Sequence, residues 1–270
     1  MIVTRRAVTS GGDTQNHPTA QSDEAQAYFN ELSVQPSEDH KDTLDNFLIK
    51  PLVANGIWAQ LDRLWVFATD SETSAATSLV NPTSTDITLV NSPTFTAFEG
   101  YAGNGTTSYI ETNFNPSTDG SNYTQNSASM GSYTRTDLAQ NSIDIGVTDL
   151  THVAYVAPYW LSGLDTLLKI NDDTVGTGSQ TSSDGLTASV RTASNDRGAW
   201  RDGVEILPGS AASTGVPNQE VYICAFGNNG TATSLSTRQI SVVFIGSGAV
   251  NQLNMYNVIQ SYMTALGKQV

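Results

Sequence analysis

The sequence predicts a mainly β protein: a jelly-roll β-sandwich with an N-terminal helical lead-in and a C-terminal helix. After Trp65, short apolar segments alternate with polar residues at a period of two, as half-buried strands do. Asn-Gly and Asp-Gly dipeptides separate these segments and are typical of tight turns. Only 14% of the 270 residues are charged, whereas ordinary domains carry about 25%. Ser, Thr, Asn and Gly supply the polar surface instead, which is common on exposed β-rich assemblies.

Residues 1–21 are polar and carry almost no large apolar side chains. Such a segment cannot bury enough surface to fold alone, so we expect an extended or flexible arm that becomes ordered only against a neighbour. No apolar run follows Arg5 and Arg6, so we expect no secretory signal.

Residues 22–64 have a helical period and form the expected lead-in. Ser22 and Ser37 each precede two acidic residues, a combination that predicts two helix N-termini because the helix dipole favours negative charge there. Pro51 is expected to interrupt the second helix, as is Gly56.

The lead-in is expected to end with one more short helical turn. Its apolar positions are Ile57, Leu61 and Leu64, which are spaced at roughly the helical period.

Residues 65–270 form the predicted sandwich, which ends in a helix. Residues 221–226 and 239–245 are apolar at nearly every position, as expected for strands covered on both faces. Residues 201–204 read as a tight hairpin turn. The closing helix is indicated by Tyr256, Ile259, Met263 and Leu266, with Gly267 as its C-terminal cap.

Charge and cysteine content exclude several classes of protein. The 26 acidic and 12 basic residues give a net charge of −14, which disfavours nucleic-acid binding through a basic patch. No run approaches the roughly 18 apolar residues that a membrane span needs. Cys224 is the single cysteine, so it cannot form an intrachain disulfide, and we expect a buried structural thiol.

Ala199–Ile206 resembles the strand–Asp-Gly–strand hairpin of laminin-G and concanavalin A-like domains, which include lectins and glucanases. Two later segments, Val221–Gly227 and Gln239–Gly246, match the order of the late strands in those domains. The resemblance implies a concanavalin-like sandwich, a fold that hosts binding, catalytic and purely structural proteins alike.

A second resemblance is to tailed-phage and prophage proteins in which a helical lead-in precedes such a sandwich. It covers about 37–270 and rests on Gly56–Trp65, Gly103–Ile110, Asn113–Thr118, Ser236–Ile240 and Ile259–Tyr262. It implies a virion structural protein, made in the host bacterial cytoplasm: a tail-fibre, head-fibre or tail-tip component whose lectin-like domain contacts host-surface glycans. The expected partners are other virion proteins, held through the arm and the helices, and two further copies of the chain in a homotrimer.

We expect no catalytic residue and no enzymatic activity. A histidine that acts as a catalytic base needs a nucleophile to activate, and the sequence contains no Gly-x-Ser-x-Gly nucleophile motif. The three histidines are His17, His40 and His152. The Glu-x-Asp-x-x-Glu strand that retaining glucanases of this fold share is missing, although two carboxylates could still meet across strands. A polysaccharide depolymerase or lyase on the same sandwich therefore stays open, as does a purely structural capsid or tail decoration protein.

Carbohydrate binding needs an aromatic surface for a sugar ring and nearby polar groups for its hydroxyls. The expected carbohydrate-binding residues are Trp160, Asn195, Trp200, Asn228 and Asn229. Each also has a structural interpretation, because either tryptophan could anchor the core and the Asn-Asn-Gly sequence could be a plain turn.

We expect no cofactor and no metal ligand. The alternative is a calcium ion at residues 171–174, with Asp184 as a further candidate ligand, because calcium takes several oxygen ligands from one loop. A solvated turn explains the adjacent aspartates equally well.

Overall fold

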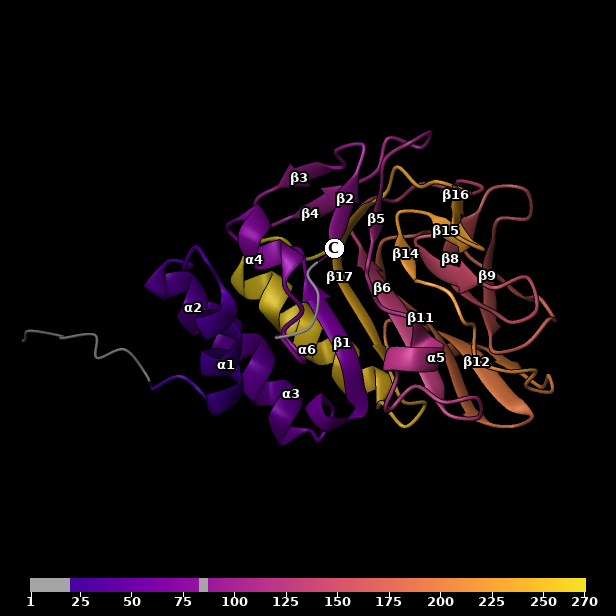
Figure 1. Ribbon diagram of the computed structural model, residues 1–270, viewed down its shortest axis with the longest axis horizontal. Coiled ribbons are helices and arrows are strands. Elements are labelled where there is room, and N and C mark those ends of the chain that lie inside the picture. Colours follow the sequence, from indigo (N-terminus) through magenta and orange to yellow (C-terminus); the bar gives the residue numbers. More distant parts are fainter. Residues whose placement is uncertain (1–19, 83–86) are drawn as a thin grey trace, which may run out of the picture.

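The computed structural model describes residues 20–82 and 87–270, and these form two β-sheets packed face to face with a layer of helices on one side (Figure 1). The predicted mainly β sandwich with a helical lead-in and a closing helix is confirmed. The arm expected at residues 1–21 lies almost wholly outside the described residues.

Most of the helices lie near the two ends of the described chain, and α5 lies between strands of the sandwich. They are α1 (Asp23–Glu31), α2 (Glu38–Leu44), the π-helix η1 (Asp45–Ile49), α3 (Lys50–Ala54), the 3-10 helix η2 (Trp58–Gln60), α4 (Glu72–Ala76), α5 (Pro116–Asp119) and α6 (Gln252–Ala265). Both predicted N-caps are confirmed, because the Ser22 and Ser37 hydroxyls accept hydrogen bonds from backbone N–H groups three residues further on.

The lead-in departs from the prediction at Pro51. The chain stays helical from Glu38 to Ala54, because the π-turn η1 directly before Pro51 widens the helix where the proline ring and its missing N–H would disturb an ordinary turn. The helix stops where expected, at Gly56, whose φ of +68° is left-handed.

The expected helical turn through Leu61 and Leu64 is wrong. A short 3-10 turn over Trp58–Gln60 leads directly into strand β1 (Leu61–Val66), all six residues of which are buried. A strand covered on both faces can mimic a helical period because apolar residues then occur irregularly along it.

Sheet A contains eight strands. Its order is β13 (Val204–Gly209), β12 (Asp196–Arg201), β11 (Gly185–Ala193), β6 (Ala128–Thr134), β17 (Gln239–Gly246), β4 (Gly100–Ala102) and β3 (Thr94–Thr96), with β1 also paired to β17. The predicted hairpin between β12 and β13 is confirmed: Asp202 and Gly203 have φ of +49° and +78°, as a type I′ turn requires.

Sheet B contains nine strands. Its order is β10 (Gly176–Ser179), β9 (Asp165–Ile170), β8 (Val153–Trp160), β7 (Ile145–Thr148), β14 (Tyr222–Ile223), β5 (Tyr109–Glu111) and β2 (Thr88–Val90), and the hairpin of β15 (Phe226–Asn228) and β16 (Thr231–Thr233) joins it at β7. The β15–β7 pair is parallel, whereas the other pairs among the described strands are antiparallel.

The strand expected over residues 221–226 is broken at Cys224. Its φ is +60°, its N–H donates to the Asp144 carbonyl, and its carbonyl accepts from the Ser236 N–H. These bonds turn the chain out of β14 and into β15. Cys224 is fully buried, as expected, and burial raises the pKa of its thiol to about 12, which keeps it in the unreactive protonated form.

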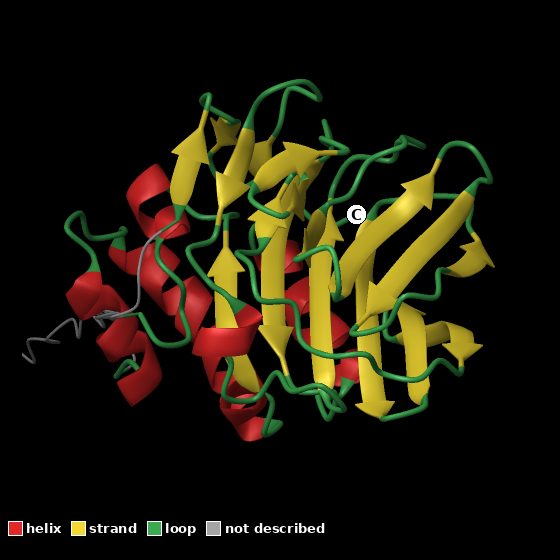
Figure 2. Cartoon of the chain, turned by 45° about the vertical axis from the view of Figure 1, so that its right-hand side comes forward, coloured by secondary structure: helices red, strands yellow, loops and turns green. Residues whose placement is uncertain are grey.

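The closing helix α6 is confirmed and packs with α2, α3 and η1 on the outer face of sheet A. Gly267 has a φ of +67°, and the Lys268 N–H reaches back to the Met263 carbonyl, as in a Schellman cap. Figure 2 shows most of the helices to the left of the strands and behind them, and no comparable helical layer covers the outer face of sheet B within the described part of the chain. No helix of the described residues combines the length and the apolar character that crossing a bilayer requires.

Candidate functional site

Two tyrosines stack on the outer face of sheet B. The ring centroids of Tyr109 on β5 and Tyr222 on β14 are 4.9 Å apart, and their planes are inclined by 31°. Side chains alternate along a strand, and the intervening Ile110 and Ile223 point into the core between the sheets, so the tyrosines face outward. Tyr222 is buried and Tyr109 is half-buried, so the Tyr109 ring is the one that solvent reaches.

Two carboxylates lie on the same face. Glu111 is opposite Tyr222 in the β14–β5 register, and its Oε1 accepts from the Tyr109 hydroxyl at 3.3 Å. Glu220 accepts from the backbone N–H of Asn113, two residues beyond Glu111. The two carboxylates therefore occupy diagonal positions on neighbouring chain segments, and residues in such positions are roughly 7–8 Å apart. Tyr109, Glu111, Glu220 and Tyr222 are called the tyrosine–carboxylate site below.

The charges of the site influence one another. Burial raises the pKa of the Glu220 carboxyl; the neighbouring Glu111 and Asp119 raise it further, and the Asn113 N–H opposes them. Burial and Glu111 also raise the pKa of both tyrosine hydroxyls. The tyrosines are therefore neutral donors, and Glu220 is a carboxyl that takes up a proton more readily than usual.

Two hollows flank this site. The first, of about 330 Å³, is lined by the Tyr109 ring and by hydroxyl and amide side chains that include Asn91, Thr106 and Thr107. The second, of about 340 Å³, is lined by Asn113, Asn115, Asp119, Gln219 and Glu220. Aromatic surface, hydroxyls, amides and carboxylates thus occur together over a short stretch of the sheet.

The segment that carries Glu220 is anchored by Asp149. Burial raises the pKa of this carboxyl, but the N–H groups of Asn218, His152 and Thr151 outweigh burial and hold the pKa well below its usual range. His152 Nδ1 lies 3.1 Å from the same carboxylate. Asp149 therefore remains charged and fixes the start of the 218–220 segment.

The structure brings two of the five sequence-predicted binding residues to this site. Asn228 and Asn229 form the β15–β16 turn, and Asn229 Oδ1 accepts from Gln219 Nε2 at 3.2 Å. Gln219 in turn lines the second hollow.

The other three predicted binding residues lie elsewhere. Trp160 is also on sheet B, but it lies at the far end of β8. The near end of that strand begins at Val153, which pairs with Thr148, and Thr148 pairs in turn with Asn228. Trp200 is on sheet A, where it packs against the helical layer. Asn195 is exposed in the β11–β12 turn of the same sheet.

None of the four members of the tyrosine–carboxylate site is among the binding residues expected from the sequence. A signal was present, because Tyr109 and Glu111, like Glu220 and Tyr222, are separated by one residue and so share one face of a strand. This spacing does not reveal that the two strands, which are more than 100 residues apart in the sequence, pair with each other.

The loop considered for calcium has other partners. Asp172 is buried and ion-paired with Arg191 at 2.8 Å and with Arg197 at 3.4 Å. Asp184 is paired instead with Arg201. Within residues 20–82 and 87–270, no group of three or more His, Cys, Asp or Glu side chains is placed to hold a metal ion.

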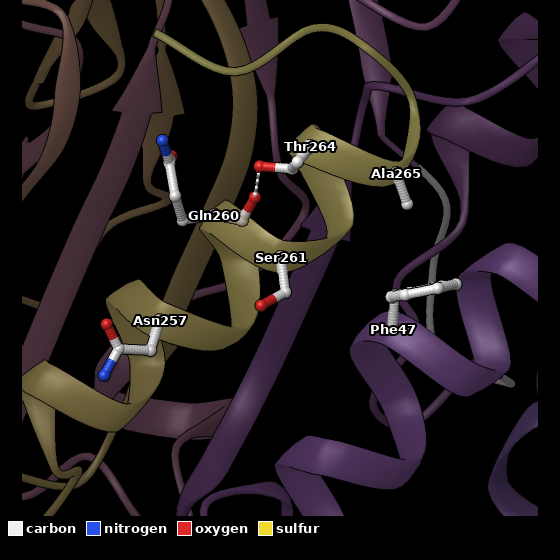
Figure 3. A pocket seen from close by; sticks show the side chains of 6 residues that line it. All are labelled: Phe47, Asn257, Gln260, Ser261, Thr264 and Ala265. Carbon is white, nitrogen blue, oxygen red and sulfur yellow. Dashed lines mark hydrogen bonds between the residues drawn. The ribbon is translucent and has the colours of Figure 1, made fainter.

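A further groove lies on the helical layer, between η1 and α6 (Figure 3). It measures about 560 Å³ and is lined by Phe47, Asn257, Gln260, Ser261, Thr264 and Ala265. None of these six side chains can ionise, so acid–base chemistry has no group to use there. The tyrosine–carboxylate site offers more to a polar ligand.

No protein-family model matches the chain, and no curated protein matches it. Solved structures do. Domain 4 of AbnA, a GH43 extracellular arabinanase from Geobacillus stearothermophilus, solved in complex with arabinotriose, matches with a TM-score of 0.52 and 15% identity, over 74% of this chain and 98% of that one. A Trypanosoma rangeli sialidase matches with a TM-score of 0.50 and 11% identity, over 76% of this chain and 33% of that one.

These matches correct one expectation. A non-enzymatic protein is expected from the sequence, yet both structures come from proteins named as enzymes, an arabinanase and a sialidase. Neither is named as a virion protein. At such low identity the matches show the fold alone, which is a sandwich of two β-sheets.

Proposed function

We propose that the chain binds an oligosaccharide on the outer face of sheet B, at the tyrosine–carboxylate site. The observation that carries this proposal is the stacked Tyr109–Tyr222 pair between two polar hollows. A sugar ring places its apolar face on the Tyr109 ring. Its hydroxyls donate to the carboxyl oxygens of Glu111 and Glu220.

The fold supports this proposal without locating the ligand. Domain 4 of the arabinanase was solved with arabinotriose, so a sandwich of this shape holds an oligosaccharide in at least that protein. Ligand sites combine apolar surface with a few well-placed polar groups, and the outer face of sheet B provides both.

Binding is tested by calorimetry or a glycan array with Tyr109→Ala, which removes the ring. Affinity should fall at least about tenfold, the amount that about 1.4 kcal/mol of lost stacking and burial represents. Tyr109→Phe keeps the ring and should keep most of the affinity. Phe47→Ala, which truncates an exposed aromatic residue on the helical layer, is the matched control. A wild-type chain that binds no glycan, or equal affinity of Tyr109→Ala and wild type, would contradict the proposal.

Glycan cleavage at the same site is a second candidate, favoured by the two carboxylates on one face and the raised pKa of Glu220. In this role Glu220 donates a proton to the glycosidic oxygen as that bond breaks. Glu111 then either attacks the anomeric carbon or takes the proton of an attacking water. Glu220→Gln should abolish release of reducing ends but weaken oligosaccharide binding only in part, because the amide oxygen still accepts a hydrogen bond. Binding without any release by the wild type would contradict this candidate.

A virion location is a separate proposal that rests on the resemblance of residues 37–270 to tailed-phage proteins. In that setting glycan binding would serve attachment to the host surface. Mass spectrometry of purified particles tests the location, and sedimentation tests the expected trimer. A monomer at micromolar concentration would count against the trimer.

A further inference from the structure

The carboxyl groups of the tyrosine–carboxylate site have no basic partner. Glu111 and Glu220 are half-buried, so solvent and a ligand can reach both side chains. Among the described residues, neither forms an ion pair, and neither does Asp119, which lines the second hollow. In contrast, the buried Asp144 and Asp172 each pair with an arginine. The negative charges of the outer face therefore act on whatever binds there.

The linings of the two hollows contain no basic side chain either. The first hollow offers hydroxyl, amide and apolar groups together with the Tyr109 ring. The second offers three amide side chains and the carboxyls of Asp119 and Glu220. A carboxylated ligand in either hollow would find hydroxyl and amide donors, but no ammonium or guanidinium group to pair with its charge.

The one basic residue on the strands of sheet B lies far from the site. It is Lys169 on β9, opposite Tyr155 of β8. Strands β8, β7 and β14 separate β9 from β5, which carries Tyr109 and Glu111. At about 4.8 Å per strand this amounts to roughly 19 Å. That separation exceeds the Debye length of about 10 Å at 0.1 M salt, so Lys169 does not offset the charge of the site.

A second cation, Arg63, interacts with Asp119 but is not available to a ligand. It is 9% exposed, and its guanidinium lies over the Phe114 ring, 4.9 Å from the centroid. Its Nη1 donates to the Asp62 carbonyl. The charges of Asp119 and Asp62 both act on it and offset its positive charge. Arg63 is thus compensated within the protein.

The pKa of Glu220 reflects this excess of negative charge. Burial raises the pKa of its carboxyl, the Asn113 N–H lowers it, and Glu111 and Asp119 raise it further. Neighbouring carboxylates raise a pKa because each one makes the charged form of the other less favourable. A ligand carboxylate beside Glu220 would meet the same repulsion, and like charges brought together on binding are costly.

We propose that the tyrosine–carboxylate site selects uncharged oligosaccharides and rejects carboxylated ones, such as chains of uronic or sialic acids. Glu111 and Glu220 are the specificity-determining residues, because their charges repel a ligand carboxylate, whereas the Tyr109 ring stacks on either kind of sugar. This inference rests on the proposed binding function and adds the class of ligand to it.

The test compares two pairs of probes by calorimetry at about pH 7.5 and about 0.1 M salt. One pair is cellotriose and the same trimer with its C6 groups oxidised to carboxylates. The other is the methyl ester of trigalacturonate and free trigalacturonate. Within each pair that binds, the uncharged member should bind at least about tenfold more tightly. At about 1 M salt, where the Debye length is about 3 Å, this ratio should narrow. Tyr109→Ala should abolish binding of the uncharged probes, which locates them at this site.

Glu111→Gln combined with Glu220→Gln should bring the affinity ratio close to one, because the amides keep acceptor oxygens but carry no charge. Glu31→Gln combined with Asp39→Asn is the matched control. It removes the same charge from exposed positions on α1 and α2 and should leave the ratio unchanged.

Equal affinity of the wild type for the two members of a pair would overturn this inference and leave the proposed function standing. An equal change of the ratio in the two double variants would also overturn it, because the net charge of the chain would then decide the selectivity. A wild type that binds none of the four probes would contradict both proposals.

Discussion

Arg238 and Asp144 form a 2.8 Å ion pair in which neither side chain is exposed. Arg238 directly precedes β17 of sheet A, and Asp144 directly precedes β7 of sheet B, so the pair ties the two sheets together. The remaining polar atoms are also satisfied: Arg238 donates to three backbone carbonyls, and Asp144 accepts from the hydroxyls of Thr134 and Ser236.

Removing one partner of this pair should be strongly destabilising. Asp144→Asn leaves the buried guanidinium without its counter-charge, which typically costs about 3–5 kcal/mol. Urea unfolding should show that loss in the free energy of unfolding. The ion pair between Lys41 and the exposed Glu38 provides the control, because Glu38→Gln should change stability by at most about 1 kcal/mol. Similar effects of the two variants would contradict the role given to Asp144.

His40 should make stability depend on pH. Its ring is 4% exposed, lies edge-on to Phe98, and has no hydrogen-bond partner on either nitrogen within the described residues. Burial lowers its pKa from 6.5, and the carboxylate of Asp70 opposes this in part. Since the unfolded chain binds the proton more readily, stability is lost as pH falls below about 6.5.

His40→Phe should remove most of this loss, as measured by urea unfolding at neutral and mildly acidic pH. Below about pH 5 the carboxylates also make the free energy of unfolding depend on pH. The two proteins should therefore be compared between about pH 7.5 and 5.5. His152→Asn, at the other described histidine, is the control. An unchanged slope in His40→Phe would show that His40 does not cause it.

Glu220→Gln should raise the thermal unfolding temperature at pH 7. The pKa of Glu220 is raised in the folded state, so its charged form disfavours folding at neutral pH, and this penalty fades as pH falls through the folded pKa. The stabilisation by Glu220→Gln should therefore shrink in acid. A variant that is less stable than the wild type at neutral pH would show that the carboxylate is needed structurally.

Comparing Gly→Ala at two glycines distinguishes the stability cost of an unfavourable backbone conformation from the cost of a steric clash. Gly56 and Gly203 both have left-handed φ, +68° and +78°. A Cβ at Gly56 meets nothing within 4 Å, whereas one at Gly203 meets the α6 backbone. Gly56→Ala should cost about 1–2 kcal/mol for the conformation alone. Gly203→Ala should cost clearly more in chemical denaturation, and equal losses would contradict the close approach of α6.

Where local chemistry decides the structure, the sequence predicts it well. The Ser22 and Ser37 caps, the Asp202-Gly203 turn and the cap at Gly267 each depend on residues a few positions apart. These interactions form within one turn of chain, so the residue types alone indicate them.

Where tertiary structure decides, the prediction fails. Pro51 is tolerated because η1 widens the helix before it, and Leu61 is in a strand because β17 lies beside it. The left-handed turn at Cys224 depends on bonds to Asp144 and Ser236, which are distant in sequence. The tyrosine–carboxylate site likewise exists only once β5 and β14 pair, and no periodicity within either strand reveals its partner.

The position of β17 has a consequence for the order of folding during synthesis. This strand lies between β6 and the strands β1 and β4 in sheet A, yet it begins only at Gln239. Until it leaves the ribosome, β1 and β6 present unpaired edges, which are prone to aggregate. Sheet A must therefore close late, through contacts of high sequence separation, and folding should be slow and dependent on protection of the nascent chain.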